Sequence, residues 1–332
     1  MCSSDLGFAH FGLSPSGALV YLTGRSQGLR TIQWVDATGR ATDLRPDPSY
    51  YVSIRLSPDG NRLGAIVSQG PNSELWVYDL LRGNKTLLTK GMDADGYPVW
   101  SPDGQFLVFQ SAGGMFWTRS DGGGKEKPLT RSKSLQLPSC FSPDGTKLAF
   151  AEFMPGGGAE IRTVPVQWIL GEMRAGEPQT FLKTPTISTF ATFSPDGQWL
   201  AYANADGGVY EVYVRAFPDN GTQVQISNAG GVMPIWSLSS RELFYRTEDQ
   251  RIMVANYTVK RGTFVPDKPR VWFGKQLATL GLTINYDLAP DGKRFAALLP
   301  AEGQEPQENQ RHVMVAPNFV DEVRRRVAGQ MR

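Results

Sequence analysis

The chain has 332 residues, a formal net charge of +2, 40% hydrophobic residues and 20% charged residues, which is typical of a globular protein. The near-neutral charge argues against nucleic acid or an anionic membrane surface as a partner. Two cysteines, Cys2 and Cys140, exclude a disulfide framework, and no run of about 18 apolar residues occurs that could form a membrane span.

The first six residues, MCSSDL, lack the basic and apolar segments of a secretory signal. We interpret residues 1–6 as a non-native leader and expect the natural protein to extend upstream. The remainder is predicted to form one domain over 7–317, followed by a C-terminal helix or tail over 318–332. In that tail, Asn318 is a suitable N-cap, and Phe319, Val323 and Val327 form an apolar stripe at helical spacing.

A five-residue motif, an apolar residue followed by Ser-Pro-Asp-Gly, recurs along the chain in more or less complete copies. Successive copies are 41 to 52 residues apart. The copies are LSPSG (13–17), LSPDG (56–60), WSPDG (100–104), FSPDG (141–145), FSPDG (193–197), WSLSS (236–240) and LAPDG (288–292). A repeat in the forties is typical of four-stranded β-propeller blades. The sequence therefore predicts an all-β protein, a propeller of about seven blades.

The residues around each motif copy predict four strands in a fixed order. A short apolar run precedes the motif, and a strand with alternating apolar residues follows it, as in QFLVFQ (105–110) and TKLAFAE (146–152). Third strands are expected over 31–37, 74–80, 115–120, 160–166, 210–217, 251–257 and 312–317. Weaker fourth strands are expected over 85–89, 126–130, 178–182, 222–228 and 270–274. The seventh unit lacks a fourth strand, so we expect imperfect ring closure by residues at or before position 7.

The Ser and Asp of the motif could be read as catalytic, but seven equivalent nucleophiles in a ring have no chemical role. Pro fixes the φ angle of a turn, Asp bonds nearby amides, and Gly takes the left-handed conformation. We therefore assign a structural role in hairpin turns to Pro58, Asp59, Gly60, Pro102, Asp103, Gly104, Pro143, Asp144, Gly145, Pro195, Asp196, Gly197, Pro290, Asp291 and Gly292.

These repeats resemble the TolB-type (WD-like) propeller repeat over nearly the whole chain. Residues 193–257, and above all YEVYVRAFP, QISNAGG and ELFYRTEDQRIMVANY, resemble the C-terminal extracytoplasmic propeller of bacterial eukaryotic-like serine/threonine protein kinases. The resemblance implies an extracytoplasmic location, on the periplasmic side, and a membrane tether upstream. It does not carry kinase activity over, because the Gly-rich loop, HRD and DFG motifs are absent.

No catalytic, cofactor-binding or metal-binding residues are predicted, and no cofactor is expected. His10 and His312 fall in predicted strands, and Cys140 takes a position that Val99 and Ile235 hold in other units. The expected function is a non-enzymatic sensor or protein-interaction module, the C-terminal part of a receptor-like kinase. A stand-alone periplasmic TolB-like scaffold, or the propeller of a prolyl-oligopeptidase-type serine peptidase, is the alternative.

We expect a protein or peptide partner, and no nucleic acid. Loops on a rigid scaffold carry function, and tyrosine is favoured at interfaces. The loops that lead from fourth to first strands share one face of a propeller, opposite the motif turns. The candidate partner face there consists of Tyr50, Tyr51, Asp95, Tyr97 and Lys133.

Overall fold

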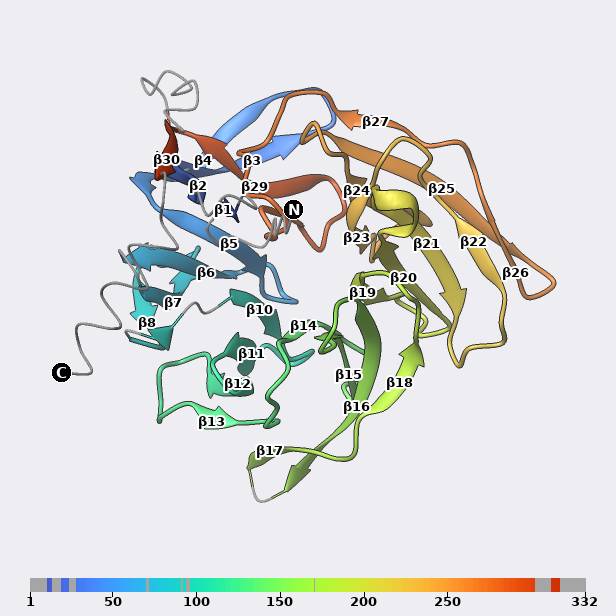
Figure 1. Cartoon of the computed structure of the whole chain (residues 1–332), viewed down its shortest axis with the longest axis horizontal. Helices are drawn as coiled ribbons and strands as arrows, with labels where there is room; N and C mark the ends of the chain where they lie inside the picture. Colours follow the sequence, from blue (N-terminus) through green and yellow to red (C-terminus); the bar gives the residue numbers. More distant parts are fainter. Residues whose placement is uncertain are drawn as a thin grey trace.

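The computed structural model describes residues 11–13, 19–23, 28–69, 72–90, 92–93, 96–169, 171–301 and 312–316. Within these residues, six antiparallel sheets are arranged as a ring around a central channel (Figure 1). We number these sheets as blades 1 to 6 in chain order. A one-turn 3-10 helix, η1 (Asp206–Gly208), lies between two strands of blade 4. No helix among the described residues is long and apolar enough to cross a membrane.

Blades 1 to 5 each come from one continuous segment, and their inner three strands follow chain order. Blade 1 contains β5 (Tyr51–Leu56), β6 (Arg62–Gln69), β7 (Asn72–Asp79), β8 (Lys85–Leu87) and β9 (Met92–Asp93). Blade 2 contains β10 (Gly96–Trp100), β11 (Phe106–Ser111), β12 (Gly114–Arg119) and β13 (Lys127–Pro128). Blade 3 contains β14 (Gln136–Phe141), β15 (Lys147–Phe153), β16 (Ala159–Ile169), β17 (Glu172–Ala175) and β18 (Gln179–Leu182). Blade 4 contains β19 (Ser188–Phe193), β20 (Trp199–Asn204), β21 (Glu211–Ala216) and β22 (Gln223–Gln225). Blade 5 contains β23 (Val232–Trp236), β24 (Glu242–Arg246), β25 (Ile252–Lys260), β26 (Thr263–Pro266) and β27 (Arg270–Phe273).

Blade 6 is built from both ends of the ring. Its strands are β28 (Tyr286–Leu288), β29 (Arg294–Pro300), β3 (Arg30–Asp36) and β4 (Ala41–Ser49). The ring closes through antiparallel pairing of β29 with β3, in which Phe295 is opposite Val35. Closure by residues at or before position 7 is therefore wrong, because β3 and β4 supply the two outer strands.

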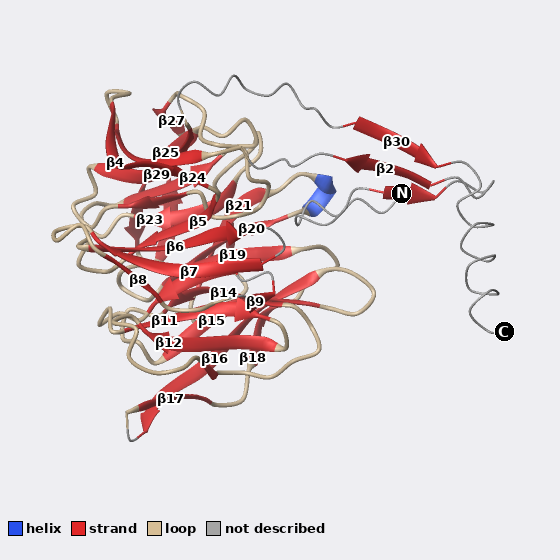
Figure 2. Ribbon diagram, turned by 90° about the vertical axis from the view of Figure 1, so that its left-hand side faces the viewer, coloured by secondary structure: helices blue, strands red, loops and turns tan. Residues whose placement is uncertain are grey.

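The prediction of seven blades is also wrong, because the ring has six. The strands on either side of the first motif copy, β1 (Phe11–Leu13) and β2 (Leu19–Thr23), do not join the ring. They form a three-stranded sheet with β30 (His312–Ala316), and Tyr21 is opposite Met314. Figure 2 shows this small sheet standing apart from the ring. The first and last predicted units have thus exchanged their third strands. The leader 1–6, His10 and the expected C-terminal helix over 318–332 lie outside the described residues.

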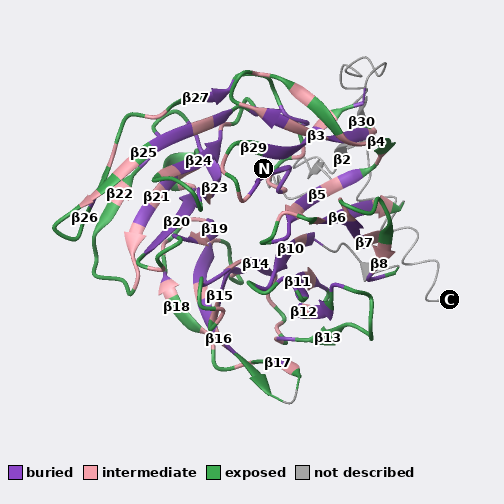
Figure 3. Ribbon diagram, turned by 180° about the vertical axis from the view of Figure 1, so that it is seen from behind, coloured by how far each residue is buried: buried purple, intermediate pink, exposed green. Residues whose placement is uncertain are grey.

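The core of the ring runs through the blades and not through the channel. Second strands, which are buried on both faces, carry fully buried aromatic residues such as Phe109, Phe150, Phe244 and Phe295. Burial of each such side chain stabilises the fold by about 1.5–3 kcal/mol. Figure 3 shows burial concentrated in the strands and exposure in the loops and outer edges. Because the strands form the core, the motif turns are left accessible at one end of the channel.

Candidate functional site

Motif turns that contain both Ser and Asp share one geometry, in which the two side chains form hydrogen bonds within the turn. In the copy at 100–104, the Ser101 hydroxyl donates to Asp103 Oδ1 at 2.5 Å and accepts from the Phe106 amide at 3.0 Å. The Gly104 amide donates to the Ser101 carbonyl at 2.8 Å, and Gly104 has φ +67°. The same bonds recur around Ser142 and Ser194. These serines therefore hold their own turns.

Neighbouring turns pack against one another around the channel. A β-carbon placed on Gly60 would lie 2.9 Å from Cδ of Pro290, and one on Gly145 would lie 3.5 Å from Cγ of Pro102. Gly60 is thus constrained twice, by its positive φ and by the proline of the preceding blade, whereas the distance at Gly145 is an ordinary van der Waals contact. The prolines of these turns therefore lie in a ring around the channel.

That ring surrounds a cavity of about 380 Å³, to which all six blades contribute. We call it the motif-face pit. Its rim consists of the residues that follow the motif serine or its equivalent, namely Pro58, Pro102, Pro143, Pro195, Leu238 and Pro290. Its floor consists of the residues immediately before the apolar motif residue, namely Arg55, Val99, Cys140, Thr192, Ile235 and Asp287. A site of this size, with mostly apolar walls and few polar groups, is in the range of ligand pockets.

Two charged side chains, Arg55 and Asp287, lie on the floor of the pit. Arg55 Nη1 is 3.4 Å from Asp287 Oδ1, and Arg55 Nη2 donates to the Ser139 carbonyl at 3.1 Å. Asp287 also accepts backbone amides, from Leu56 at 2.7 Å and from Leu288 at 3.2 Å. Burial raises the pKa of Asp287, while Arg55 and these amides act in the opposite direction. The floor therefore holds one basic and one acidic side chain in contact with each other.

The channel is narrow beyond Arg55. A second cavity of about 20 Å³, enough for one water molecule, lies deeper and is lined by Arg55, Phe190 and Met233 among others. Phe190 and Met233 have positive φ angles of 56° and 54°, at bulges in the inner strands of their blades. Such a conformation is unusual for bulky residues and is maintained only by the surrounding packing.

The loop over 274–285 and the residues it contacts lie at the end of the channel opposite the motif. Tyr97 donates to the Leu282 carbonyl at 3.2 Å, and its ring is 6.3 Å from that of Phe190. Arg246 donates to the Gly281 carbonyl at 2.6 Å and to Asn285 Oδ1 at 2.8 Å. Burial lowers the pKa of Arg246 to about 10, which leaves it charged at neutral pH. We infer that this loop obstructs the channel at that end.

The predicted partner-face residues that the structure describes differ in their exposure. Tyr50 is 38% exposed and Lys133 is exposed, but Tyr51 is 2% exposed and its ring packs against Tyr78. Tyr97 is part of the packing against loop 274–285, and burial raises its pKa. Asp95 lies outside the described residues. A role for Tyr50 and Lys133 in binding stays a prediction.

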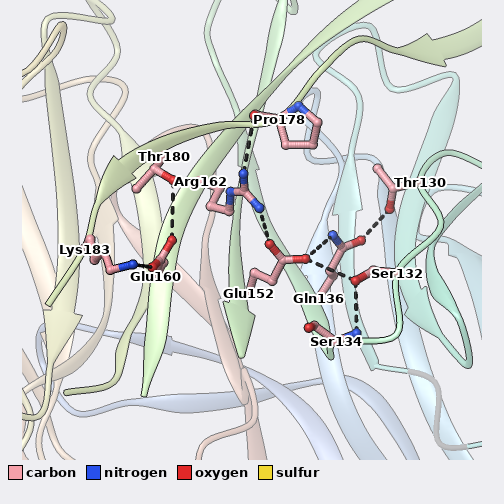
Figure 4. Close-up of polar contacts among 10 residues, drawn as sticks. All are labelled: Thr130, Ser132, Ser134, Gln136, Glu152, Glu160, Arg162, Pro178, Thr180 and Lys183. Carbon is pink, nitrogen blue, oxygen red and sulfur yellow. Dashed lines mark hydrogen bonds and ion pairs between the residues drawn. The ribbon is translucent and has the colours of Figure 1, made fainter. Parts of the chain in front are cut away.

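The loop that carries Lys133 is held by a polar network in blade 3, shown in Figure 4. Glu152 accepts hydrogen bonds from Gln136 at 2.8 Å, from Ser132 at 3.1 Å and from Arg162. Burial alone would raise the pKa of Glu152, but these donors hold it below its usual value. Because the described partners satisfy Glu152, we assign this network to structure.

The floor of the pit is not predicted by any single residue of the sequence, although the repeat contains the signal. Cys140, Val99 and Ile235 were aligned at one position, and Arg55 and Asp287 occupy that position in two other units. A charged residue at a repeat position where the other units have small or apolar residues is the signal that marks Arg55 and Asp287. Cys140 is half-buried on the floor, and its thiol contacts the Phe141 carbonyl at 3.0 Å. His312 begins β30. No described group of three or more His, Cys, Asp or Glu residues could hold a metal ion.

Comparison of the sequence with known proteins gives distant relatives. No protein-family model matches the chain. The uncharacterized protein Atu1656 of Agrobacterium fabrum is 29% identical over 214 residues, which cover 60% of this chain and 72% of that protein. A TolB homolog of Chlorobium luteolum is 28% identical over 136 residues, which cover 40% of this chain and 30% of that protein. The uncharacterized peptidase YuxL of Bacillus subtilis is 23% identical over 195 residues, which cover 47% of this chain and 29% of that protein. The chain thus spans less than a third of two of these relatives.

Comparison with solved structures identifies the fold. A TolB candidate from Agrobacterium tumefaciens superposes with a TM-score of 0.60 at 18% identity, over 82% of this chain and 98% of that chain. TolB from Acinetobacter baumannii gives 0.51 at 16% identity, over 88% of this chain and 66% of that chain. A chain of the mitotic checkpoint complex gives 0.51 at 14% identity, over 88% of this chain and 89% of that chain. The protein has a TolB-like β-propeller fold.

Proposed function

We propose that this protein is a non-catalytic, TolB-like scaffold that binds a protein partner by accepting a segment of it in the motif-face pit. The observation that carries the proposal is the pit itself, which six blades line with apolar residues around one charge pair. Leu238, where the other five blades have proline, is 64% exposed at the rim. An exposed leucine beside such a pit favours contact with an apolar partner segment.

The pit supports binding better than catalysis. Three of its serines, Ser57, Ser142 and Ser194, each donate to an aspartate of their own turn, and the described residues that line the pit include no histidine. The peptidase alternative has one relative in its favour, YuxL, which matches over a minor part of its length. We therefore propose that the described ring has no hydrolase activity of its own.

The kinase-receptor reading and the extracytoplasmic location rest on the resemblance of residues 193–257. The TolB-like structures favour the scaffold reading instead. The genomic sequence upstream separates the two: a kinase domain with a membrane span would restore the receptor reading.

The test is binding of the purified chain to an array of random peptides, with Leu238→Glu as the disrupting variant. A charge at the rim should weaken binding about tenfold or more, because a carboxylate resists burial against apolar groups. Leu81→Glu is the matched control, since Leu81 is 77% exposed and does not line the pit. Equal binding by the Leu238→Glu variant and the wild type would place the site elsewhere. Turnover of peptide or ester substrates would overturn the non-catalytic assignment.

A further inference from the structure

The two charges on the floor of the pit are not equivalent. Asp287 accepts the Leu56 amide at 2.7 Å and the Leu288 amide at 3.2 Å, which fix the position of its carboxyl group. The contact between Arg55 Nη1 and Asp287 is longer, at 3.4 Å. The guanidinium group of Arg55 is therefore the less tightly held of the two, and its side of the ion pair is open to competition.

Arg55 retains donors that the described residues do not use. A guanidinium group has five N–H donors in a planar fork, and the structure shows one hydrogen bond to Asp287 and one to the Ser139 carbonyl. These two partners come from different blades, so the guanidinium spans part of the channel and forms the base of the pit. A planar fork with free donors at the bottom of an apolar pit suits a carboxylate.

We propose that Arg55 binds a carboxylate of the partner segment, whose apolar side chains lie against the upper wall of the pit. The inference rests on the proposed function and specifies the chemistry of its ligand. A cation is disfavoured because Arg55 lies beside Asp287, whose oxygens already accept amides. A dianion such as phosphate is disfavoured relative to a carboxylate, because Asp287 beside Arg55 repels two negative charges more strongly than one.

Asp287 sets the strength of this site. Its charge competes with the ligand carboxylate for Arg55, so Asp287→Asn should strengthen carboxylate binding severalfold. The amide oxygen of asparagine can still accept the Leu56 N–H, which keeps the backbone of the two inner strands in place. A purely structural role of the ion pair predicts the opposite, because loss of either charge would then weaken the fold and binding together.

The experiment compares two arrays of the same short random peptides, one ending in a free carboxylate and one in a carboxamide. Wild-type protein should bind the carboxylate forms about tenfold or more tighter, as expected for a lost charge-assisted hydrogen bond. Arg55→Gln should abolish the preference, Arg55→Lys should reduce it by removing the fork, and Asp287→Asn should increase it. Thermal melting checks that each variant is folded. If Arg55→Gln does not fold, Arg55→Lys still tests the role of the guanidinium group.

Carboxamide arrays with an internal glutamate identify the source of the carboxylate. Binding to these at wild-type strength, lost in Arg55→Gln, assigns the group to a side chain; binding to free C-termini alone assigns it to the chain end. Equal binding of carboxylate and carboxamide peptides, with the Leu238→Glu effect intact, overturns the role of Arg55 but leaves the scaffold proposal standing. Absence of binding to every array overturns both.

Discussion

The indole nitrogen of Trp100 donates a hydrogen bond to the carbonyl oxygen of Arg55 at 3.0 Å, across the boundary between blades 2 and 1. Trp236 makes the same bond to Thr192 at 3.0 Å, between blades 5 and 4. In both pairs, the apolar residue of one motif holds the floor position of the preceding blade. At these two boundaries the motif tryptophan thus holds the floor of the pit through its backbone and leaves the floor side chain free to differ.

Replacement of Trp100 with phenylalanine tests this link between blades. The change removes the bond to Arg55 and the contact with the Arg62 guanidinium, whose Cζ is 5.0 Å from the indole. We expect a loss of about 2 kcal/mol in the free energy of unfolding, measured by urea denaturation. Trp76→Phe is the control, since the Trp76 indole donates to Glu74 at 3.0 Å and lies under Lys85 Nζ at 4.6 Å, both within blade 1. Equal losses in the two variants would contradict a special role for the bond between blades.

Gly60→Ala tests the packing of neighbouring motif turns. Alanine at this position would be strained by the positive φ of 70°, and its β-carbon would lie 2.9 Å from Cδ of Pro290. Gly39→Ala has a similar φ of 82° but nothing within 4 Å, so it reports the backbone strain alone. We expect Gly39→Ala to cost about 1 kcal/mol and Gly60→Ala about 1–3 kcal/mol more. The same thermal midpoint for both variants would show that the turns do not brace one another.

Glu152 should make stability depend on pH at the acid end. Its pKa is lowered in the folded protein, so its stabilising contribution is fully present above the ordinary glutamate pKa. That contribution is lost as pH falls through the lowered value, because the unfolded chain binds a proton at Glu152 more readily than the folded protein does. Wild-type stability should therefore fall more steeply than that of Glu152→Gln between about pH 5 and pH 3. Glu126→Gln, at an exposed position, should follow the wild-type curve in the same denaturation series.

A chain shortened to residues 28–301 tests the six-blade ring. The closing pair β29–β3 runs from Arg294 opposite Asp36 to Pro300 opposite Arg30, all within this range. The shortened chain should keep its β-sheet circular dichroism and a single cooperative thermal transition. Loss of cooperativity would show that the sheet of β1, β2 and β30 is needed for the ring.

The sequence by itself determined the local elements of this protein. Each motif turn is specified by four or five adjacent residues, through the φ of proline, the acceptor of Asp103 or its equivalents and the positive φ of glycine. The predicted fourth strands over 178–182 and 270–274 correspond to β18 and β27, because alternation of apolar residues is also a local property. The all-β propeller follows from the repeat of these units.

Tertiary structure decided how many blades the ring has and where its pit lies. Val35 pairs with Phe295, and Tyr21 pairs with Met314, although the motif count assigned the third strands the other way. Either third strand has the alternation of apolar residues that either sheet requires, so only the pairing between distant segments determines which strand joins which sheet. Arg55 and Asp287 are likewise far apart in sequence and meet only because closing the ring makes their blades neighbours. Turn chemistry acts over a few residues, whereas ring closure is a property of the whole chain.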